Sequence, residues 1–389
     1  MSGAAWEELC DALRAAGRLV LGEGVPDSPR QRAEGFRYLT RFLAAGIAVC
    51  VEHGDAEQPE LCRMIEASTK WGLDMPDCLY LFAPVRGDAV YRLRGERGSA
   101  NHFDVQVNFG HFASGDIGSW GTISSRHGGE LEVGPDGSLE IVLAAEERPG
   151  NWLRLAPEAE FVLIRQYFAD WERERPANLD ILREGGEVLA PPPRSDQMAA
   201  RLARLAEWLT KGGALWERMS RGLLSMPPNS LVFHDPGAAG ARAGLAGQAY
   251  GMGHFRCAPE EAVILEFPVP RCRHWSVSLA SYYWESLDYA SHQSSLNGVQ
   301  AELDADGVFR GVIAHRDPGV PNWLDPTGHE DGSLAVRFLL AEGASKPVLR
   351  AVPFTSLRDE LPPTRSVSPA ERAEHLLRRR RAVWRRFRR

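Results

Sequence analysis

Apolar residues recur at helical spacing along the first 70 residues of the chain. The runs EELCDALRAAGRLVL and RQRAEGFRYLTRFLAAGIAVCVE place apolar side chains three and four positions apart, which is typical of helices with one buried face. Ser28 followed by Pro29 marks the start of the second helix, and PELCRMIEASTK is expected to form a shorter third helix. The pattern therefore predicts an N-terminal helical segment over residues 1–70.

The periodicity then changes to the alternation that is typical of strands. Over residues 71–168, short runs such as LYLFAPV, HFDVQVNF and FVLIRQYF are separated by Gly, Pro or Asp, and PDG at 135–137 marks a hairpin turn. Helical spacing returns between about 169 and 222, most clearly in QMAARLARLAEWLTKGGALWERMSRGLL, and a stretch rich in Gly, Pro and Ala follows. Residues 169–245 are therefore expected to form a helical insertion and a loop.

A second β region is predicted over residues 246–356, with DADG at 304–307 as a further turn, and residues 357–389 are expected to form a linker and a basic C-terminal helix. Hairpin-type links rather than helical crossovers separate the strands, so both β regions are expected to be antiparallel. The predicted fold class is α+β. Two antiparallel β regions of sandwich or jelly-roll type are joined by N-terminal and central helical segments.

One short motif occurs in each β region. GNWL stands at 150–153 and PNWL at 321–324, and each follows an apolar run and a turn with Pro or Gly. Four residues are too few to establish a duplication. The motif does suggest that an Asn-Trp pair closes equivalent corners in the two β regions.

The composition is that of an ordinary globular protein. The chain has 389 residues, of which 44% are hydrophobic and 25% are charged, which suits one large or two medium domains. No apolar run reaches the length of a membrane-spanning helix, and the N-terminus lacks the basic start and apolar core of a signal peptide. The six cysteines are scattered without a CxxC pair, so we expect reduced thiols and a cytoplasmic protein.

Positive charge is concentrated at the C-terminus. The chain carries a net charge of −7, yet residues 369–389 hold nine arginines against two glutamates. Such a tail can bind nucleic acid or an acidic membrane surface. We favour a helix that docks on the protein while its arginines face water, so nucleic acid is not an expected partner. The docking side chains would be Leu376, Leu377, Val383, Trp384 and Phe387.

Several long runs resemble a bacterial family. GMGHFRCAPEEAVILEFPVPRCRHWSVSL, LDYASHQSSLN and DADGVFRGVIAHRDPGVPNWLDPTGHEDG are similar to the family known as domain of unknown function 1214, as are DMPDCLYLFAPVRGDAVYRLRGERGSANHF and GNWLRLAPEAEFVLIRQYFADWERERPANL upstream. The resemblance covers roughly residues 70–345. It implies a β-rich, jelly-roll-like fold with helical insertions, and it implies no settled activity. The chemistry has to be inferred from the residues themselves.

The run HRDPGVPNWLDPTGHE at 315–330 holds the densest set of ionisable groups, on a loop stiffened by three prolines. A carboxylate beside an imidazole is a general acid/base arrangement, so His315, Asp317, Asp325 and His329 are candidate catalytic residues. The alternative is structural: the aspartates cap turns, and His329 packs on a neighbouring tryptophan.

A strand over HWSVSLASYYW would present an unusually polar face that includes His274, Tyr282 and Trp284. That face is suited to line a cavity, with Tyr282 or Tyr283 as a proton donor and His274 and Trp284 as binding residues. The same residue types also occur in plain sandwich cores, so a core or surface role remains open. In addition, Asp288 in the following loop is a candidate to close the cavity.

Three further residues are candidates for substrate binding. Arg271 is suited to an anionic group, Trp323 offers a stacking surface, and His102 lies in NHFDVQVNF on a regular polar strand face. We expect that face to be exposed to solvent, with a ligand channel as the alternative. The HxD spacing at His102 and at His315 is too short and common to predict a metal, so no cofactor is expected.

These observations favour a small-molecule enzyme of hydrolase or lyase type. It would act on a sugar-like or other small organic substrate through the His/Asp-rich loop of the second β region. No phosphate-binding loop and no GxSxG motif is present. The alternative is a β-sandwich that binds a small ligand or glycan without turnover. A small-molecule partner is expected in both cases, and a homo-oligomer remains open.

Overall fold

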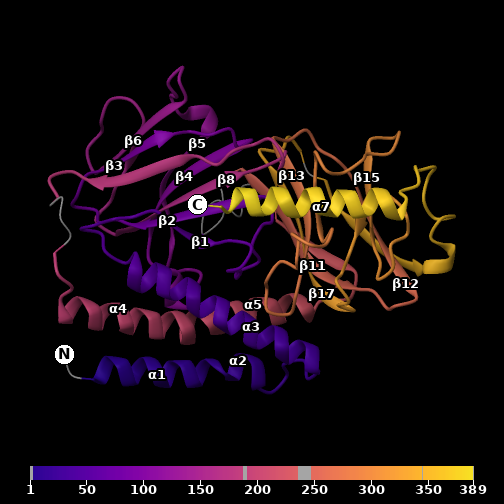
Figure 1. Ribbon diagram of the computed structural model, residues 1–389, viewed down its shortest axis with the longest axis horizontal. Coiled ribbons are helices and arrows are strands. Elements are labelled where there is room, and N and C mark those ends of the chain that lie inside the picture. Colours follow the sequence, from indigo (N-terminus) through magenta and orange to yellow (C-terminus); the bar gives the residue numbers. More distant parts are fainter. Residues whose placement is uncertain (1–2, 187–190, 235–246, 344, 389) are drawn as a thin grey trace. The chain divides into compact units, whose positions relative to one another are not determined.

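The computed structural model describes residues 3–186, 191–234, 247–343 and 345–388 (Figure 1). The chain forms two compact units, which are described one at a time. Unit 1 comprises Met1–Trp71, Leu79–Gln166 and Arg175–Glu217, and unit 2 comprises Gly72–Cys78, Tyr167–Glu174 and Arg218–Arg389. The first predicted β region therefore contributes Gly72–Cys78 and the first two residues of Tyr167–Glu174 to unit 2.

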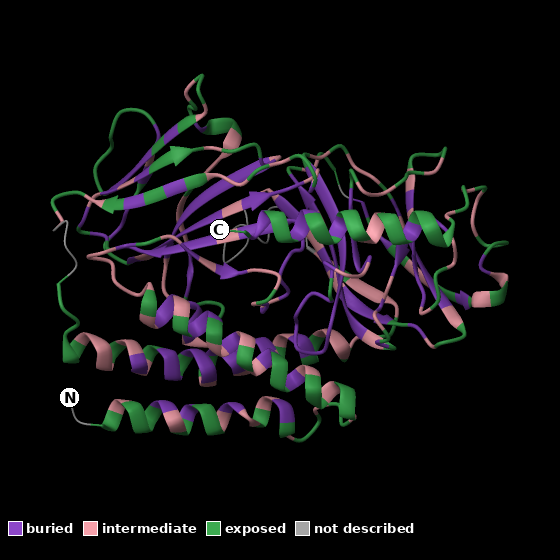
Figure 2. Ribbon diagram, viewed as in Figure 1, coloured by how far each residue is buried: buried purple, intermediate pink, exposed green. Residues whose placement is uncertain are grey.

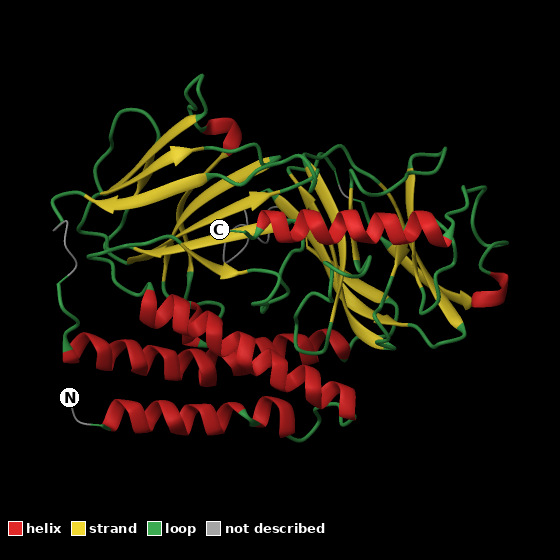
Figure 3. Ribbon diagram, viewed as in Figure 1, coloured by secondary structure: helices red, strands yellow, loops and turns green. Residues whose placement is uncertain are grey.

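Unit 1 contains most of the helices (Figure 3). They are α1 (Ala4–Ala16), α2 (Arg18–Leu21), α3 (Pro29–Gly46) and α4 (Ser195–Glu207), and α5 (Gly213–Leu224) crosses the unit boundary. Ser28 caps α3 as expected, because its side chain accepts a hydrogen bond from the Gln31 N–H at 3.2 Å. Two π-helical turns, Ile47–Glu52 and Trp208–Gly212, follow α3 and α4 directly.

Two sheets complete unit 1. The five-stranded sheet has the order β1 (Cys62–Ile65), β2 (Cys78–Pro84), β8 (Ala159–Tyr167), β4 (His102–Phe109), β5 (Gly121–His127). The four-stranded sheet has the order β7 (Trp152–Arg154), β6 (Ser138–Ala144), β3 (Tyr91–Glu96), β9 (Asn178–Arg183). The predicted helices over 59–70 and 169–183 are wrong where β1 and β9 form. Strand β1 pairs with β2 and buries Met64, and β9 pairs with β3 and buries Ile181, so that strand pairing satisfies both backbones.

Unit 2 is a sandwich of two sheets. One has the order β10 (Ser230–His234), β11 (Gln248–Arg256), β17 (Asp331–Leu339), β13 (His274–Ala280), β14 (Ser295–Asn297). The other has the order β16 (Trp323–Leu324), β15 (Val308–Ile313), β12 (Glu261–Pro268), β18 (Val348–Pro353). Aromatic residues of both sheets meet in its core, among them Phe267, Trp275, Phe309 and Phe338. These strands are largely buried (Figure 2), and the α+β sandwich prediction is confirmed.

The two units contain the same β topology twice. Strands β1 to β9 form the two sheets of unit 1, and strands β10 to β18 form the two sheets of unit 2. The order of the strands within the sheets is the same in both units, so each strand of the first set corresponds to the strand nine places later in the chain. The correspondence includes strand direction, because β6 and β7 pair in parallel, and so do their counterparts β15 and β16. The correspondence suggested by the Asn-Trp motif therefore extends over the sheets of both units.

The Asn-Trp motif makes the same contacts in both units. Asn151 exchanges hydrogen bonds with the backbone of Glu132 at 2.7 and 2.8 Å and donates to the Glu140 carbonyl at 2.9 Å. Asn322 does the same with the backbones of Glu302 and Arg310, at 2.9, 2.6 and 3.1 Å. Each asparagine thus satisfies three backbone groups where the chain leaves a turn and enters a parallel strand.

The helix α7 (Pro369–Arg386) docks in unit 2, but only Val383 and Phe387 of the expected side chains are buried. Val383 is fully buried, whereas Leu377 and Trp384 remain 48% and 43% exposed. The buried stripe contains instead Arg372, Arg379 and Arg386, seven residues apart, and their guanidinium groups donate to carbonyl oxygens. None of the described helices is long and apolar enough to cross a membrane.

Candidate functional site

The histidines of the loop 315–330 contact backbone carbonyls. In unit 2 the loop leads from β15 to β17 and includes β16. The His315 Nε2 lies 2.9 Å from the Cys257 carbonyl oxygen, and the His329 Nδ1 lies 3.0 Å from the Pro326 carbonyl oxygen. Because a carbonyl only accepts, each of these ring nitrogens carries a proton. The two imidazoles are held by separate parts of the backbone and do not converge on one point.

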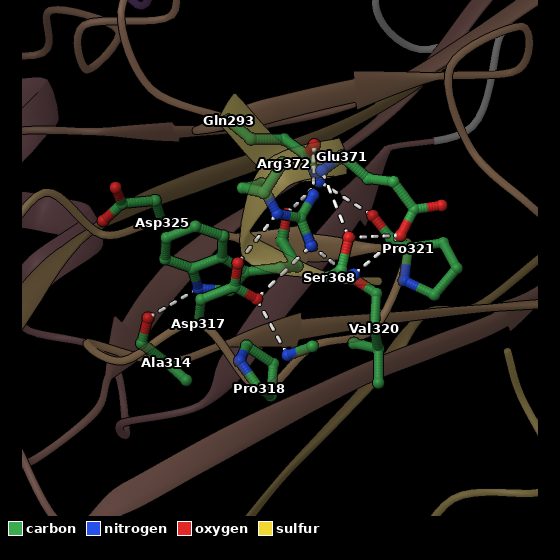
Figure 4. A network of polar contacts seen from close by, with 12 residues as sticks. Gln293, Ala314, Asp317, Pro318, Val320, Pro321, Asp325, Ser368, Glu371 and Arg372 are labelled. Atoms are coloured by element: carbon green, nitrogen blue, oxygen red, sulfur yellow. Dashed lines mark hydrogen bonds and ion pairs between the residues drawn. The ribbon is translucent and has the colours of Figure 1, made fainter. Parts of the chain in front are cut away.

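Asp317 anchors the C-terminal helix (Figure 4). Its Oδ2 pairs with the Arg372 Nε at 2.9 Å, and its Oδ1 accepts the Gly319 N–H at 2.8 Å. Arg372 also donates to the Gln293 side chain at 2.9 Å and to the Val320 carbonyl at 2.5 Å. Each nitrogen of this guanidinium therefore donates to a protein acceptor, and the pair holds α7 in place.

Asp325 forms an acid/base pair with a histidine outside the loop. The His292 Nδ1 lies 2.7 Å from the Asp325 Oδ2, while the Asp325 Oδ1 accepts the Thr327 N–H at 2.7 Å. The hydrogen bond from His292 to Asp325 raises the pKa of the imidazole above its ordinary value, although partial burial opposes this. The His292 side chain is 43% exposed. The structure therefore brings Asp325 to His292 rather than to His329.

His274 belongs to a buried network centred on Asp77. Its Nε2 lies 3.2 Å from one carboxylate oxygen, and the other oxygen accepts from the Trp171 indole and the Asn297 amide, both at 2.7 Å. Burial alone would raise the pKa of Asp77, but the hydrogen bonds from His274 and Asn297 outweigh it and hold the pKa below its ordinary value. These donors surround the carboxylate, so His274 acts here as a structural partner.

The aromatic segment after β13 is also tightly packed. The Tyr282 and Tyr283 rings meet edge to face at 5.2 Å, and both side chains are buried. Trp284 adopts a left-handed backbone with φ of 57°, which is costly for a bulky residue. Its carbonyl accepts the Leu73 N–H at 2.7 Å, which helps to hold that conformation.

The remaining candidates of unit 2 have ordinary structural contacts. The Asp288 side chain accepts the N–H groups of Ala290 and Ser291 at 3.2 and 3.1 Å, as in an Asx turn. The Arg271 side chain is 85% exposed and lies 3.6 Å from Glu342. Trp323 is buried, and its indole donates to the Ala314 carbonyl at 2.8 Å.

The polar face of β4 in unit 1 is buried, so the expectation that it faces solvent is wrong. His102 and Asp104 are 5% and 2% exposed. Burial raises the pKa of Asp104 to about 7, although Arg165 at 3.6 Å opposes the shift. The rings of His102 and His127 lie 5.7 Å apart.

Within the described part of the chain, no group of three His, Cys, Asp or Glu residues is arranged to hold a metal ion.

A cavity of about 280 Å³ lies within unit 1, a volume close to that of roughly nine water molecules. We call it the His111 cavity. Val49, Phe82 and Pro84 provide apolar walls, and the π-helical turn Ile47–Glu52 forms one side. Helix α4 forms another side through Gln197, Ala200, Arg201 and Arg204, which share one helix face. π-Helical turns occur often at functional sites.

His111 lines this cavity with a ring whose protonation state is defined by its contacts. Its Nδ1 accepts the Ala113 N–H at 3.1 Å, so the proton of the neutral ring lies on Nε2. Among the described residues, the Nε2 has no hydrogen-bond partner. Burial among Phe82, Phe161 and Trp208, together with repulsion by Arg204, lowers the pKa of His111 to about 3. The ring is therefore neutral near pH 7.

The charged groups around the His111 cavity are paired. Arg201 lies 2.8 Å from Asp55, and Arg204 lies 3.0 Å from Glu160. Burial raises the pKa of the Cys50 thiol to about 12, so this thiol is protonated and a poor nucleophile. The cavity is thus electrically balanced, and His111 and Gln197 are neutral polar residues in its wall.

Sequence reasoning missed this cavity. Its walls come from segments far apart in the chain, and a single histidine in the run GHF carries no motif. One signal was available: positions 197, 200, 201 and 204 place a glutamine and two arginines on one side of a helix whose other side is apolar.

Comparison with known proteins identifies the family. A family model described as protein of unknown function (DUF1214) matches residues 83–170. The chain is also similar to an uncharacterised protein from Burkholderia cenocepacia of known crystal structure. The two are 32% identical, with a TM-score of 0.87, and the match covers 91% of this chain and 98% of that one. The chain belongs to the DUF1214 family. The DUF1214 match includes Pro84, His111 and Glu160 of the cavity.

A second solved structure is more distant. The VPA0106 protein from Vibrio parahaemolyticus aligns with 88% of this chain and 100% of its own, at 13% identity and a TM-score of 0.48. No protein with a curated description matches the chain. Because the Burkholderia protein is itself described as uncharacterised, a function has to be argued from geometry.

Proposed function

We propose that this protein binds a small, uncharged organic molecule in the His111 cavity. The observation that carries the proposal is the neutral His111 Nε2–H, which has no acceptor among the described residues, on a ring that lines a pocket with apolar sides. A ligand oxygen would accept this hydrogen bond in place of water while the apolar part of the ligand contacts the apolar walls. The expected ligand therefore has an apolar body and a carbonyl or hydroxyl oxygen.

The charge balance favours a neutral ligand over an ion. The arginines of the cavity each pair with a carboxylate, so an anion would have to displace Asp55 or Glu160 from its partner. A sugar-like molecule or another small polar organic compound makes no such demand. The volume of about 280 Å³ restricts the ligand to one small ring or a short chain.

A thermal-shift screen with small neutral alcohols, ketones, amides and monosaccharides tests this proposal. A ligand at a hundredfold excess over its Kd stabilises the folded protein by about 2.7 kcal/mol, which raises the Tm measurably. The substitution Ala200→Trp should abolish the shift, because Ala200 is exposed at the cavity wall and the indole would occupy the space. His111→Phe should weaken it by removing the donor.

Ala373→Trp is the matched control, since Ala373 is an exposed helical alanine that lines no described cavity. It should retain the shift. If every ligand that stabilises the wild type also stabilises Ala200→Trp to the same extent, binding occurs elsewhere and the proposal fails.

Acid/base catalysis of hydrolase or lyase type is a second candidate, supported by the pair of His292 and Asp325 at 2.7 Å. The carboxylate fixes the orientation of an imidazole that reaches solvent, which is the arrangement of a general base. p-Nitrophenyl esters and glycosides are suitable model substrates. A hydrolysis rate that is unchanged in His292→Gln would remove this candidate.

A further inference from the structure

The outward face of α7 carries a stripe of apolar and cationic side chains. Leu377, Arg381, Trp384 and Arg388 follow one another at intervals of four, three and four residues, so they share one side of the helix. Leu377 and Trp384 are 48% and 43% exposed, and both arginines are exposed as well. We call this set the α7 stripe; large apolar side chains exposed among cations mark an interaction surface.

Two neighbouring arginines contribute unpaired positive charge at the α7 stripe. Arg380 and Arg381 form no ion pair among the described residues. Glu374 is the acidic residue on this side of the helix, and it pairs with Arg378 at 3.1 Å. Exposed Arg380 and Arg385 flank the stripe. A chain with a net charge of −7 therefore presents one strongly cationic face.

We propose that the α7 stripe binds an acidic phospholipid surface. Arginine side chains near such a surface pair with lipid phosphates, while the exposed indole and leucine enter the headgroup boundary. Single-stranded nucleic acid would use the arginines and stack a base on Trp384, but Leu377 would gain nothing from it. The pairing of an aliphatic with an aromatic side chain along the stripe favours lipid. The α7 stripe shares no residue with the His111 cavity, so this proposal does not rest on the proposed function.

Vesicle co-sedimentation tests the proposal with the full chain. At 100 mM NaCl we expect the protein to sediment with vesicles of 30% phosphatidylglycerol in phosphatidylcholine and to stay in the supernatant with phosphatidylcholine alone. Each arginine near an acidic surface contributes about fivefold, so Arg380→Ala with Arg381→Ala should weaken binding roughly 25-fold. Trp384→Ala should weaken it as well. Because these side chains are exposed, the variants should keep the wild-type Tm.

Arg173→Ala is the matched control, because the Arg173 side chain is 89% exposed in unit 2 but lies outside α7. It should bind vesicles as tightly as the wild type. Equal binding to both kinds of vesicle, no binding to either, or full binding by the double arginine variant would overturn the proposal. Tight binding of a poly-dT oligonucleotide, lost in the double variant and without vesicle binding, would assign the stripe to nucleic acid instead.

Discussion

Replacing Asp77 with alanine should destabilise unit 2 strongly. The carboxylate accepts hydrogen bonds from His274, Trp171 and Asn297, and it is 2% exposed. Its removal leaves three buried donors without that acceptor, at a cost of about 1–3 kcal/mol for each donor that stays unsatisfied. Since Asn297 also donates to the carbonyls of Phe168 and Ala169, its share of the cost is smaller. We expect a total loss of about 3–5 kcal/mol.

Urea unfolding followed by tryptophan fluorescence measures this loss, because Trp171 lies in the network. Asp77→Asn retains one acceptor oxygen and should cost less, about 1–2 kcal/mol. The pH dependence supplies an independent check. The pKa of Asp77 is lowered in the folded state, so its contribution is fully present above about pH 4 and is lost as the pH falls through the folded pKa. The acid limb of the stability profile should therefore be shallower in Asp77→Asn.

A loss smaller than about 0.5 kcal/mol in Asp77→Ala would refute the reasoning, since that is the size of an ordinary surface substitution. An unchanged acid limb in Asp77→Asn would show that Asp77 titrates normally in the folded protein. Asp88→Ala is a suitable control, because Asp88 is an exposed carboxylate in unit 1.

Three further predictions concern the repeat, the acid/base pair and the C-terminus. Asn151→Ala and Asn322→Ala should each cost about 2–3 kcal/mol in urea unfolding, because each asparagine satisfies three backbone groups. Asp325→Asn should lower the pKa of His292, measured by NMR titration of its ring protons, because the charged acceptor is lost. Deleting residues 354–389 should cause aggregation, seen by light scattering, because the apolar outer face of β12 and β15 loses its cover.

Each of these predictions has a contradicting outcome. Asparagine costs that differ by more than about 2 kcal/mol would mean that the two corners are not energetically equivalent. An unchanged titration of His292 would mean that Asp325 does not control it. A truncated chain that stays monomeric would mean that the outer face tolerates water.

The sequence predicted the fold class well because it depends on periodicity. The helices around α1, α3, α4 and α7 and most strands follow from the spacing of apolar residues. β1 and β9 were missed because four to six residues of mixed pattern fit either element, and a partner strand decides between them. The shared Asn-Trp corner was visible, whereas the common strand order of the two units required the structure.

The outer faces of the two four-stranded sheets carry different residue types at equivalent positions, because their surroundings differ. In unit 1, Arg92 pairs there with Glu140 and Glu184. At the equivalent place in unit 2 stands Ile264, packed in an apolar cluster with Leu357 of the C-terminal segment. The duplicated strands have therefore adapted to water in one unit and to a covering segment in the other.

The candidate site was harder to predict because polar partners lie far apart in the sequence. Asp325 meets His292 across 33 residues, and Asp317 meets Arg372 across 55. A polar pattern also predicts exposure, yet α7 buries Arg379, whose guanidinium stacks on Trp171 and donates to the Tyr289 carbonyl. A charged side chain can be buried where hydrogen-bond partners satisfy it, and the spacing of residues along the sequence does not reveal those partners.

The central claim is that the His111 cavity holds a small neutral molecule. A crystal structure of the protein soaked separately with isopropanol, acetamide and cyclohexanone tests it most directly. We predict density for at least one probe inside the cavity, with its oxygen within hydrogen-bonding distance of the His111 Nε2. Probes that occupy other surfaces while the cavity stays filled by water or by rearranged side chains would contradict the claim.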